Sequence, residues 1–206
     1  MKRAYSVDNV LTARFNRMEF DGQWEEAIGC PELTGTWIIF GDIKNGKTSL
    51  SLQLAKYLTR FGRVAYNSVE EGLSASIQEA FKREAIQEVG SKLILLDKES
   101  QSDLKKRLRK HKSPEIVVID TVQFWELRFS EYKRLKEMFP KKLFIYVSHI
   151  DGGKPAGATA VKIWRDANVA IRVEGFKGFP VGRYGGGEPI IINRELADAY
   201  WGLKMK

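Results

Sequence analysis

The chain has 206 residues, a formal net charge of +8 and a single cysteine, Cys30. This length fits one domain with a sizeable core. One cysteine excludes an internal disulfide framework and a cysteine-based zinc site. No apolar run reaches the length of a membrane span, and the first residues lack a signal peptide's apolar stretch, so we expect a cytoplasmic protein. The positive charge favours a polyanionic partner.

Residues 1–34 lack a clear period and combine arginines with aromatic side chains. We interpret them as an N-terminal arm and assign residues 35–206 to the main domain. The arm packs either on the core or on a neighbouring subunit, and the sequence leaves both possibilities open.

The most informative stretch is residues 41–48, which read Gly-Asp-Ile-Lys-Asn-Gly-Lys-Thr. An apolar run at 37–40 predicts a buried strand before it, and leucines at helical spacing over 50–58 predict a helix after it. Such a loop cradles phosphates with backbone N–H groups and the helix dipole, while its lysine reaches the β- and γ-phosphates and its threonine ligates Mg²⁺. We therefore expect ATP and Mg²⁺. The expected binding residues are Gly41, Asp42, Ile43, Lys44, Asn45, Gly46, Lys47, Thr48 and Ser49.

Strands and helices alternate downstream of this loop. Apolar runs predict further strands over 63–69, 92–97, 115–120 and 143–147. The alternation predicts an α/β fold with a mainly parallel, twisted sheet flanked by helices. A helix between these strands is marked by a capping-box spacing of Ser76 and Glu79.

The last third of the chain differs in composition. Residues 150–158 are glycine-rich and predict a mobile loop. Residues 169–174 and 189–193 resemble two strands joined by a long tip, 175–188, which forms a C-terminal β-hairpin extension. The helix over 103–110 is strongly basic, and its positive face either meets solvent or contacts nucleic acid.

Polar residues follow four of the predicted strands, and in a parallel sheet such residues meet at one edge. Asp120 suits a Mg²⁺ ligand acting through water, although it could also be a strand-end cap. Glu70 suits a carboxylate that orients the attacking water. Glu71 is its rival, and both could instead be solvated. His149 either hydrogen-bonds the γ-phosphate or serves as a local partner.

These motifs together resemble the RecA-like ATPase core, most closely the bacterial RadA-type repair ATPases and DnaB-type replicative helicases. The resemblance rests on residues 41–48, 66–71, 118–123 and 147–149 and spans roughly residues 35–195. It implies that Glu70 is the catalytic glutamate and Asp120 the Walker B aspartate. The families' flanking domains are missing, so we expect a minimal ATPase core.

The resemblance also bears on two later segments. It implies that Lys154 lies in a DNA-binding loop and that Arg183 corresponds to an arginine finger acting on a neighbouring subunit. Val181 stands where the family motif has lysine, so half of that motif is absent. Lys177 and Phe179 in the glycine-rich tip suit contacts with single-stranded DNA, although ordinary surface loops remain an alternative.

The leading hypothesis is a DNA-stimulated ATPase of recombination, repair or replication that forms a homo-oligomeric ring or filament on single-stranded DNA. The alternative is a nucleotide-switched, KaiC-like signalling or scaffold ATPase without a DNA role. A small-molecule kinase is a third possibility, for which the sequence offers no lid or acceptor motif.

Overall fold

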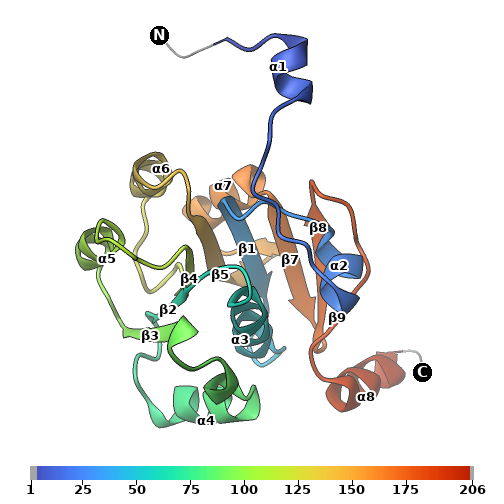
Figure 1. Cartoon of the computed structure of the whole chain (residues 1–206). Coiled ribbons are helices and arrows are strands. Elements are labelled where there is room, and N and C mark those ends of the chain that lie inside the picture. The colour runs from blue at the N-terminus through green and yellow to red at the C-terminus, as the bar shows by residue number, and fades with distance from the viewer. Residues whose placement is uncertain (1–3, 205–206) are drawn as a thin grey trace.

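The computed structural model describes residues 4–204, and within that range a nine-stranded, mostly parallel sheet organises the chain (Figure 1). Its strands are β1 (Gly35–Gly41), β2 (Val64–Ser68), β3 (Leu93–Asp97), β4 (Ile116–Asp120), β5 (Leu143–Asp151), β6 (Lys154–Pro155), β7 (Val169–Glu174), β8 (Lys177–Gly182) and β9 (Ile190–Ile191). Their order is β3-β2-β4-β5-β1-β7-β8-β9, with β6 paired to β5. The strands from β3 to β7 in this order are parallel, and β8 and β9 add antiparallel pairs. The predicted fold class is confirmed.

Helices cover both faces of the sheet. They are α1 (Val7–Leu11), α2 (Gly22–Ile28), α3 (Lys47–Leu58), α4 (Ala75–Arg83), the 3₁₀ segment η1 (Ile86–Lys92), α5 (Gln101–Leu108), α6 (Phe129–Met138), α7 (Ala158–Asp166) and α8 (Arg194–Lys204). Alternate side chains of β1 divide the core: Trp37 and Ile39 pack with α3, whereas Ile38 and Phe40 pack with α6 and α7. Strands buried on both faces read as continuous apolar runs, which is why the sequence revealed them.

The predicted mobile loop over 150–158 is wrong in its first half. β5 continues to Asp151, turns at Gly152 and Gly153, and returns as β6, so this segment is a short β-hairpin. Both turn glycines have positive φ, 54° and 79°, as tight hairpin turns require.

The predicted hairpin with a long tip over 175–188 is also wrong. β7 turns directly into β8 at Gly175 and Phe176, whose φ values are 52° and 57°. β8 reads Lys-Gly-Phe-Pro-Val-Gly, and its glycines and proline hide the strand signal. β9 pairs only with the start of β8, so Pro180 lies where the outer edge of β8 is unpaired.

The N-terminal arm divides into two parts. Met18, Phe20, Trp24 and Ile28 are buried in the core cluster on the α3 face, so this half of the arm packs on its own domain. The preceding helix α1 projects away from the body in Figure 1, and none of its residues is buried. Each of the two alternatives for the arm therefore has a segment it can apply to.

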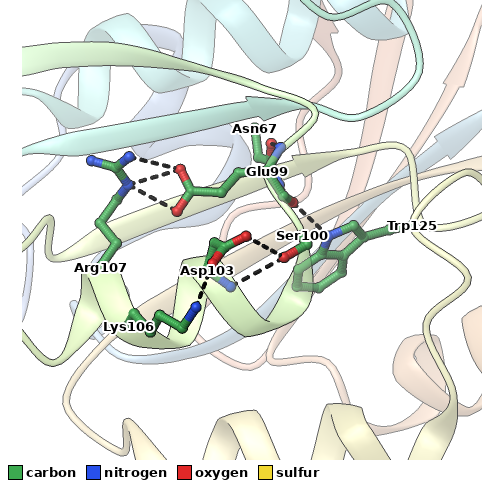
Figure 2. Close-up of polar contacts among 7 residues, drawn as sticks. All are labelled: Asn67, Glu99, Ser100, Asp103, Lys106, Arg107 and Trp125. Carbon is green, nitrogen blue, oxygen red and sulfur yellow. Dashed lines mark hydrogen bonds and ion pairs between the residues drawn. The ribbon is translucent and has the colours of Figure 1, made fainter.

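The basic helix α5 is bound into its surroundings by ion pairs (Figure 2). Arg107 contacts Glu99 at 2.8 Å, and Lys106 contacts Asp103 at 2.8 Å. The backbone of Glu99 is itself held by the side chain of Asn67 on β2 and by the Trp125 indole. These pairs favour the solvated interpretation of the α5 face over a nucleic-acid contact.

Candidate nucleotide-binding site

The phosphate loop lies between β1 and α3, as predicted. Gly46 adopts φ 99° immediately before α3, and a Cβ there would lie 3.2 Å from the Phe176 ring. A Cβ on Gly41 would lie 2.3 Å from the carbonyl oxygen of Val173. Both glycines are therefore required by the backbone, one by its conformation and one by close approach.

Lys47 is the buried cation of the site, with 8% of its surface exposed. Its Nζ donates a hydrogen bond to the carbonyl oxygen of Asp42 at 2.7 Å. Burial lowers its pKa, and the negative charges of Asp120, Asp42 and Glu70 oppose that effect. An ammonium group held this close to the loop backbone is positioned to neutralise phosphate charge.

Asp120 ends β4 and is buried, with 9% of its surface exposed. Burial raises its pKa to about 6; the charges of Glu70 and Glu71 raise it further, while a hydrogen bond from Tyr66 and the charge of Lys47 oppose the rise. The Tyr66 hydroxyl donates to Asp120 Oδ2 at 2.5 Å. That hydroxyl also lies 2.8 Å from Ser51 Oγ on α3. The sequence analysis missed Tyr66, whose only signal was a tyrosine inside an otherwise apolar strand.

Glu70 follows β2 and faces the end of β4. Its backbone N–H donates to the Asp120 carbonyl at 3.1 Å, and its Oε2 accepts a hydrogen bond from Thr121 Oγ1 at 3.3 Å. The same Oε2 lies 3.6 Å from His149 Nε2. The predicted pair of Glu70 and His149 therefore does come together, beside Asp120.

Glu71 has a different environment. Its exposed carboxylate accepts a hydrogen bond from the Ser76 hydroxyl. The predicted capping role of Ser76 is wrong, because Ser74 precedes α4 and accepts the hydrogen bond from Ile77 N at 3.3 Å. This geometry favours Glu70 over Glu71 as the carboxylate that faces the site.

His149 is held by its neighbours on β5 and the loop after β4. Its backbone N–H donates to Gln123 Oε1 at 3.3 Å, and Gln123 Nε2 donates to Ser148 Oγ at 2.8 Å and to the Ala156 carbonyl at 2.9 Å. Within residues 4–204, the buried Nδ1 of His149 has no hydrogen-bond partner. Gln123 thus connects the Walker B loop to the β5–β6 hairpin.

A cavity of about 460 Å³ opens beside the phosphate loop. Apolar lining comes from Phe176, Ile192 and Leu196, and polar lining outside the loop comes from Gln53, Arg83, Glu84 and Asn193. The β7–β8 turn is fastened to the loop, because Gly175 N donates to Asn45 Oδ1 at 2.8 Å and Phe176 N donates to the Asn45 carbonyl at 3.2 Å. An apolar cavity with a few polar groups suits a nucleoside.

The donor set fits ATP with Mg²⁺. The loop, Lys47 and the adjoining cavity offer sites for phosphates and nucleoside, and Thr48 and Asp120 offer oxygen ligands for the metal. In the described part of the chain, no three His, Cys, Asp or Glu side chains gather into a metal cluster. A Mg²⁺ ion here would therefore depend on phosphate oxygens, as is usual for this metal.

Arg183 does not join this site. The β1–β7 and β7–β8 registers put Gly41 beside Val173, at one end of β7, and Gly182 opposite Val169, at the other end. Arg183 is consequently at the sheet edge opposite its own phosphate loop, and its side chain is exposed.

The residues expected to contact single-stranded DNA are separated. Lys154 is exposed on the β5–β6 hairpin. Lys177 and Phe179 instead lie within β8, where both contact the Trp201 ring, at 5.6 Å and 5.9 Å. Arg172 stacks on the Phe179 ring at 5.2 Å. The glycine-rich tip does not present these two side chains, because they pack against α8.

No family model and no curated protein matches this chain. Solved structures do. The flagellar accessory protein FlaH from Methanocaldococcus jannaschii matches with a TM-score of 0.55 at 18% identity, over 86% of this chain and 97% of that one. An ATPase domain solved on its own matches with a TM-score of 0.54 at 15% identity, over 76% and 80%. A KaiC-like protein from Pyrococcus horikoshii OT3 matches with a TM-score of 0.52 at 16% identity, over 77% and 84%.

The chain therefore has the RecA-like, KaiC-like P-loop ATPase fold. At these identities the likeness shows the fold alone. It does not distinguish the RadA and DnaB ATPases as nearer relatives, and it brings no DNA role to this chain. None of the described helices is both long and apolar enough to cross a bilayer.

Proposed function

We propose that this protein binds and hydrolyses ATP and uses the nucleotide state as a switch, in the manner of a KaiC-like signalling or scaffold ATPase. The observation that carries the proposal is the meeting of Lys47, Asp120, Glu70 and His149 at one edge of the sheet beside the phosphate loop. Their chemistry supplies charge neutralisation, a metal ligand and a water-orienting carboxylate, which phosphoryl transfer to water needs.

Bound with Mg²⁺, ATP supplies a γ-phosphoryl group open to attack by water. Lys47 neutralises phosphate charge, and Thr48 and Asp120 would hold the metal. Glu70 orients the attacking water and accepts its proton. The Thr121 hydroxyl and His149 fix the orientation of the Glu70 carboxylate through contacts at 3.3 Å and 3.6 Å.

Two hairpins are connected to the site and could report its state. Gln123 ties the β5–β6 hairpin to the loop after Asp120, and Asn45 ties the β7–β8 turn to the phosphate loop. A change at the γ-phosphate would reach both hairpins through hydrogen bonds made by single side chains. This arrangement suits a switch, whichever partner reads it.

We also propose a homo-oligomer, ring or filament. Val7, Val10 and Leu11 of α1 are 60–77% exposed, which suits packing on a neighbouring copy. Arg183, remote from its own phosphate loop, would then complete the site of a neighbour. An arginine finger of this kind stabilises charge that develops on the γ-phosphate.

The DNA-acting alternative has weaker support. It rests on the resemblance and on Lys154, since Lys177 and Phe179 are engaged with α8. A kinase role has no specific observation in its favour. We therefore rank the nucleotide switch first.

The proposal is tested by titrating Mg-ATP into the wild-type protein and Lys47→Ala in a calorimeter and by measuring phosphate release. We expect binding and slow hydrolysis in the wild type and a large loss of affinity in Lys47→Ala. Lys44→Ala is a matched control, because Lys44 lies in the same loop with an exposed side chain. Equal affinity in wild type and Lys47→Ala would contradict the proposal.

A further inference from the structure

A second concave site lies at the sheet edge opposite the phosphate loop. It is a hollow of about 180 Å³ where β2 and β3 begin and the loop after α5 passes beside them. Its basic lining residues are Arg63, Lys92, Arg107, Lys110, His111 and Lys112. The other described residues that line it are apolar residues, serines and a proline, so no carboxylate borders it. A five-residue strand such as β2 separates it from the nucleotide site by about 17 Å.

Most of these cations lack a counter-charge. Among the described residues, Arg107 is paired with Glu99 at 2.8 Å, whereas Arg63, Lys92, Lys110 and Lys112 make no ion pair. This differs from the exposed face of α5, where Lys105 and Lys106 each contact an acid. The hollow is therefore more than the solvated face of a basic helix.

The nearest acid does not neutralise the hollow. Glu115 Oε2 accepts a hydrogen bond from the backbone N–H of Arg63 at 2.8 Å. Beneath the loop, Lys142 donates to Ser113 Oγ at 2.9 Å and to the Pro114 carbonyl at 2.7 Å. Burial lowers the pKa of Lys142, and the Arg63 charge lowers it further while Glu115 opposes both. Crowded positive groups without an anion produce a field that attracts one.

The chemistry of the lining restricts the ligand. The hollow admits a phosphate group but offers no aromatic side chain on which a base could stack. The exposed large hydrophobic residues of the described chain all lie elsewhere, so this edge also lacks the apolar anchors of a membrane-binding surface. Contacts to phosphates alone fit a duplex, whose backbone is read without regard to sequence.

We propose that this hollow binds the phosphate backbone of a nucleic-acid duplex. The inference goes beyond ATP binding, because the phosphate loop and Glu70 take no part in it. Exposed Lys110 and Lys112 provide the outer contacts, and Arg63 and Lys92 provide those nearest the strand ends.

The test is a fluorescence-anisotropy titration of a labelled DNA duplex of about 20 base pairs, long enough for several phosphate contacts, with the single strand of the same length and anionic phospholipid vesicles in parallel. The site variant is Lys110→Glu/Lys112→Glu. The matched control, Lys133→Glu/Lys162→Glu, makes the same charge change at two exposed lysines on α6 and α7. Unchanged Mg-ATP binding in both variants confirms that they are folded.

We expect the wild type and the control to bind duplex with a steep salt dependence. The site variant should lose about 1.8 from the slope of log affinity against log salt, at about 0.9 for each phosphate contact. Equal weakening in both variants would reduce the effect to net charge and overturn the proposal. So would failure of the wild type to bind duplex at low salt, preference for single strands that depends on Lys154, or lysine-dependent binding to vesicles only.

Discussion

The two edges of the sheet carry charge in opposite ways. At the carboxyl edge, Asp120, Tyr66 and Ser51 are buried and hydrogen-bonded to one another, and Glu70 lies against His149. At the other edge, Arg183 and the basic hollow are exposed, and most of the charges are unpaired. Buried, oriented groups suit chemistry, whereas exposed groups suit association with another molecule. The comparison assigns hydrolysis to one edge and partners to the other.

Arg183 offers the strongest way to join the two edges. We expect Arg183→Ala to lose about 10³–10⁵ in turnover if it acts as a finger on a neighbouring subunit. Mixing Arg183→Ala with Glu70→Gln should restore part of the ATPase activity, because some interfaces then contain both intact residues. Phosphate release from the mixed, freely exchanging subunits is the measurement.

The rival interpretation makes Arg183 a DNA contact or a cap of the β8 end, which the valine at 181 keeps open. Full ATPase activity in Arg183→Ala, or no recovery on mixing, would exclude the finger. The two edges would then work independently.

Asp120 provides the next largest effect, on stability. Its pKa is raised from 3.8 to about 6, so in the metal-free protein its contribution to stability is full below about pH 4 and is lost as pH rises through 6. Asp120→Asn should therefore exceed the wild type in free energy of unfolding by about 3 kcal/mol at pH 7.5. Chemical denaturation at both pH values checks this; a wild type that gains stability between pH 4 and 7.5 relative to the variant would contradict it.

The phosphate loop and Asp120 could be predicted from sequence because local rules govern them. A glycine loop between an apolar strand and a helix has one common geometry, and aspartate at the end of a buried parallel strand reaches the same edge. Glu70 and His149 followed from the same topology. The choice between Glu70 and Glu71 did not, because it depends on Ser76, which was assigned a different role.

Phe176 marks the limit of prediction from local patterns. It was expected in a long surface tip, but its positive φ forms a two-residue turn that brings it to Gly46, across a sequence separation no local pattern encodes. The strand β8 was hidden for a similar reason, since pairing with β7 overrides its glycines and proline.

Phe176→Ala should weaken Mg-ATP binding by about tenfold, the loss expected for one aromatic contact with a base. Phe179→Ala is the matched control, because that ring packs against Trp201 rather than lining the cavity. Calorimetric affinities for both variants decide the matter. Equal loss in both would indicate a general effect on the hairpin.

The smallest expected effect concerns α1. Leu11→Asp should shift the oligomer toward smaller species in size-exclusion chromatography with light scattering, because a charge on an exposed apolar helix opposes packing on a neighbour. Leu203→Asp, at an equally exposed leucine of α8, is the control. An unchanged mass for Leu11→Asp would leave α1 without a role in assembly.

The central claim is that Glu70 at the carboxyl edge drives hydrolysis. Single-turnover hydrolysis of Mg-ATP by wild type, Glu70→Gln and Glu71→Gln tests it most directly. We predict that Glu70→Gln binds ATP with wild-type affinity but hydrolyses it about 10²–10⁴-fold more slowly, whereas Glu71→Gln stays near wild type. Normal hydrolysis by Glu70→Gln together with loss in Glu71→Gln would contradict the account.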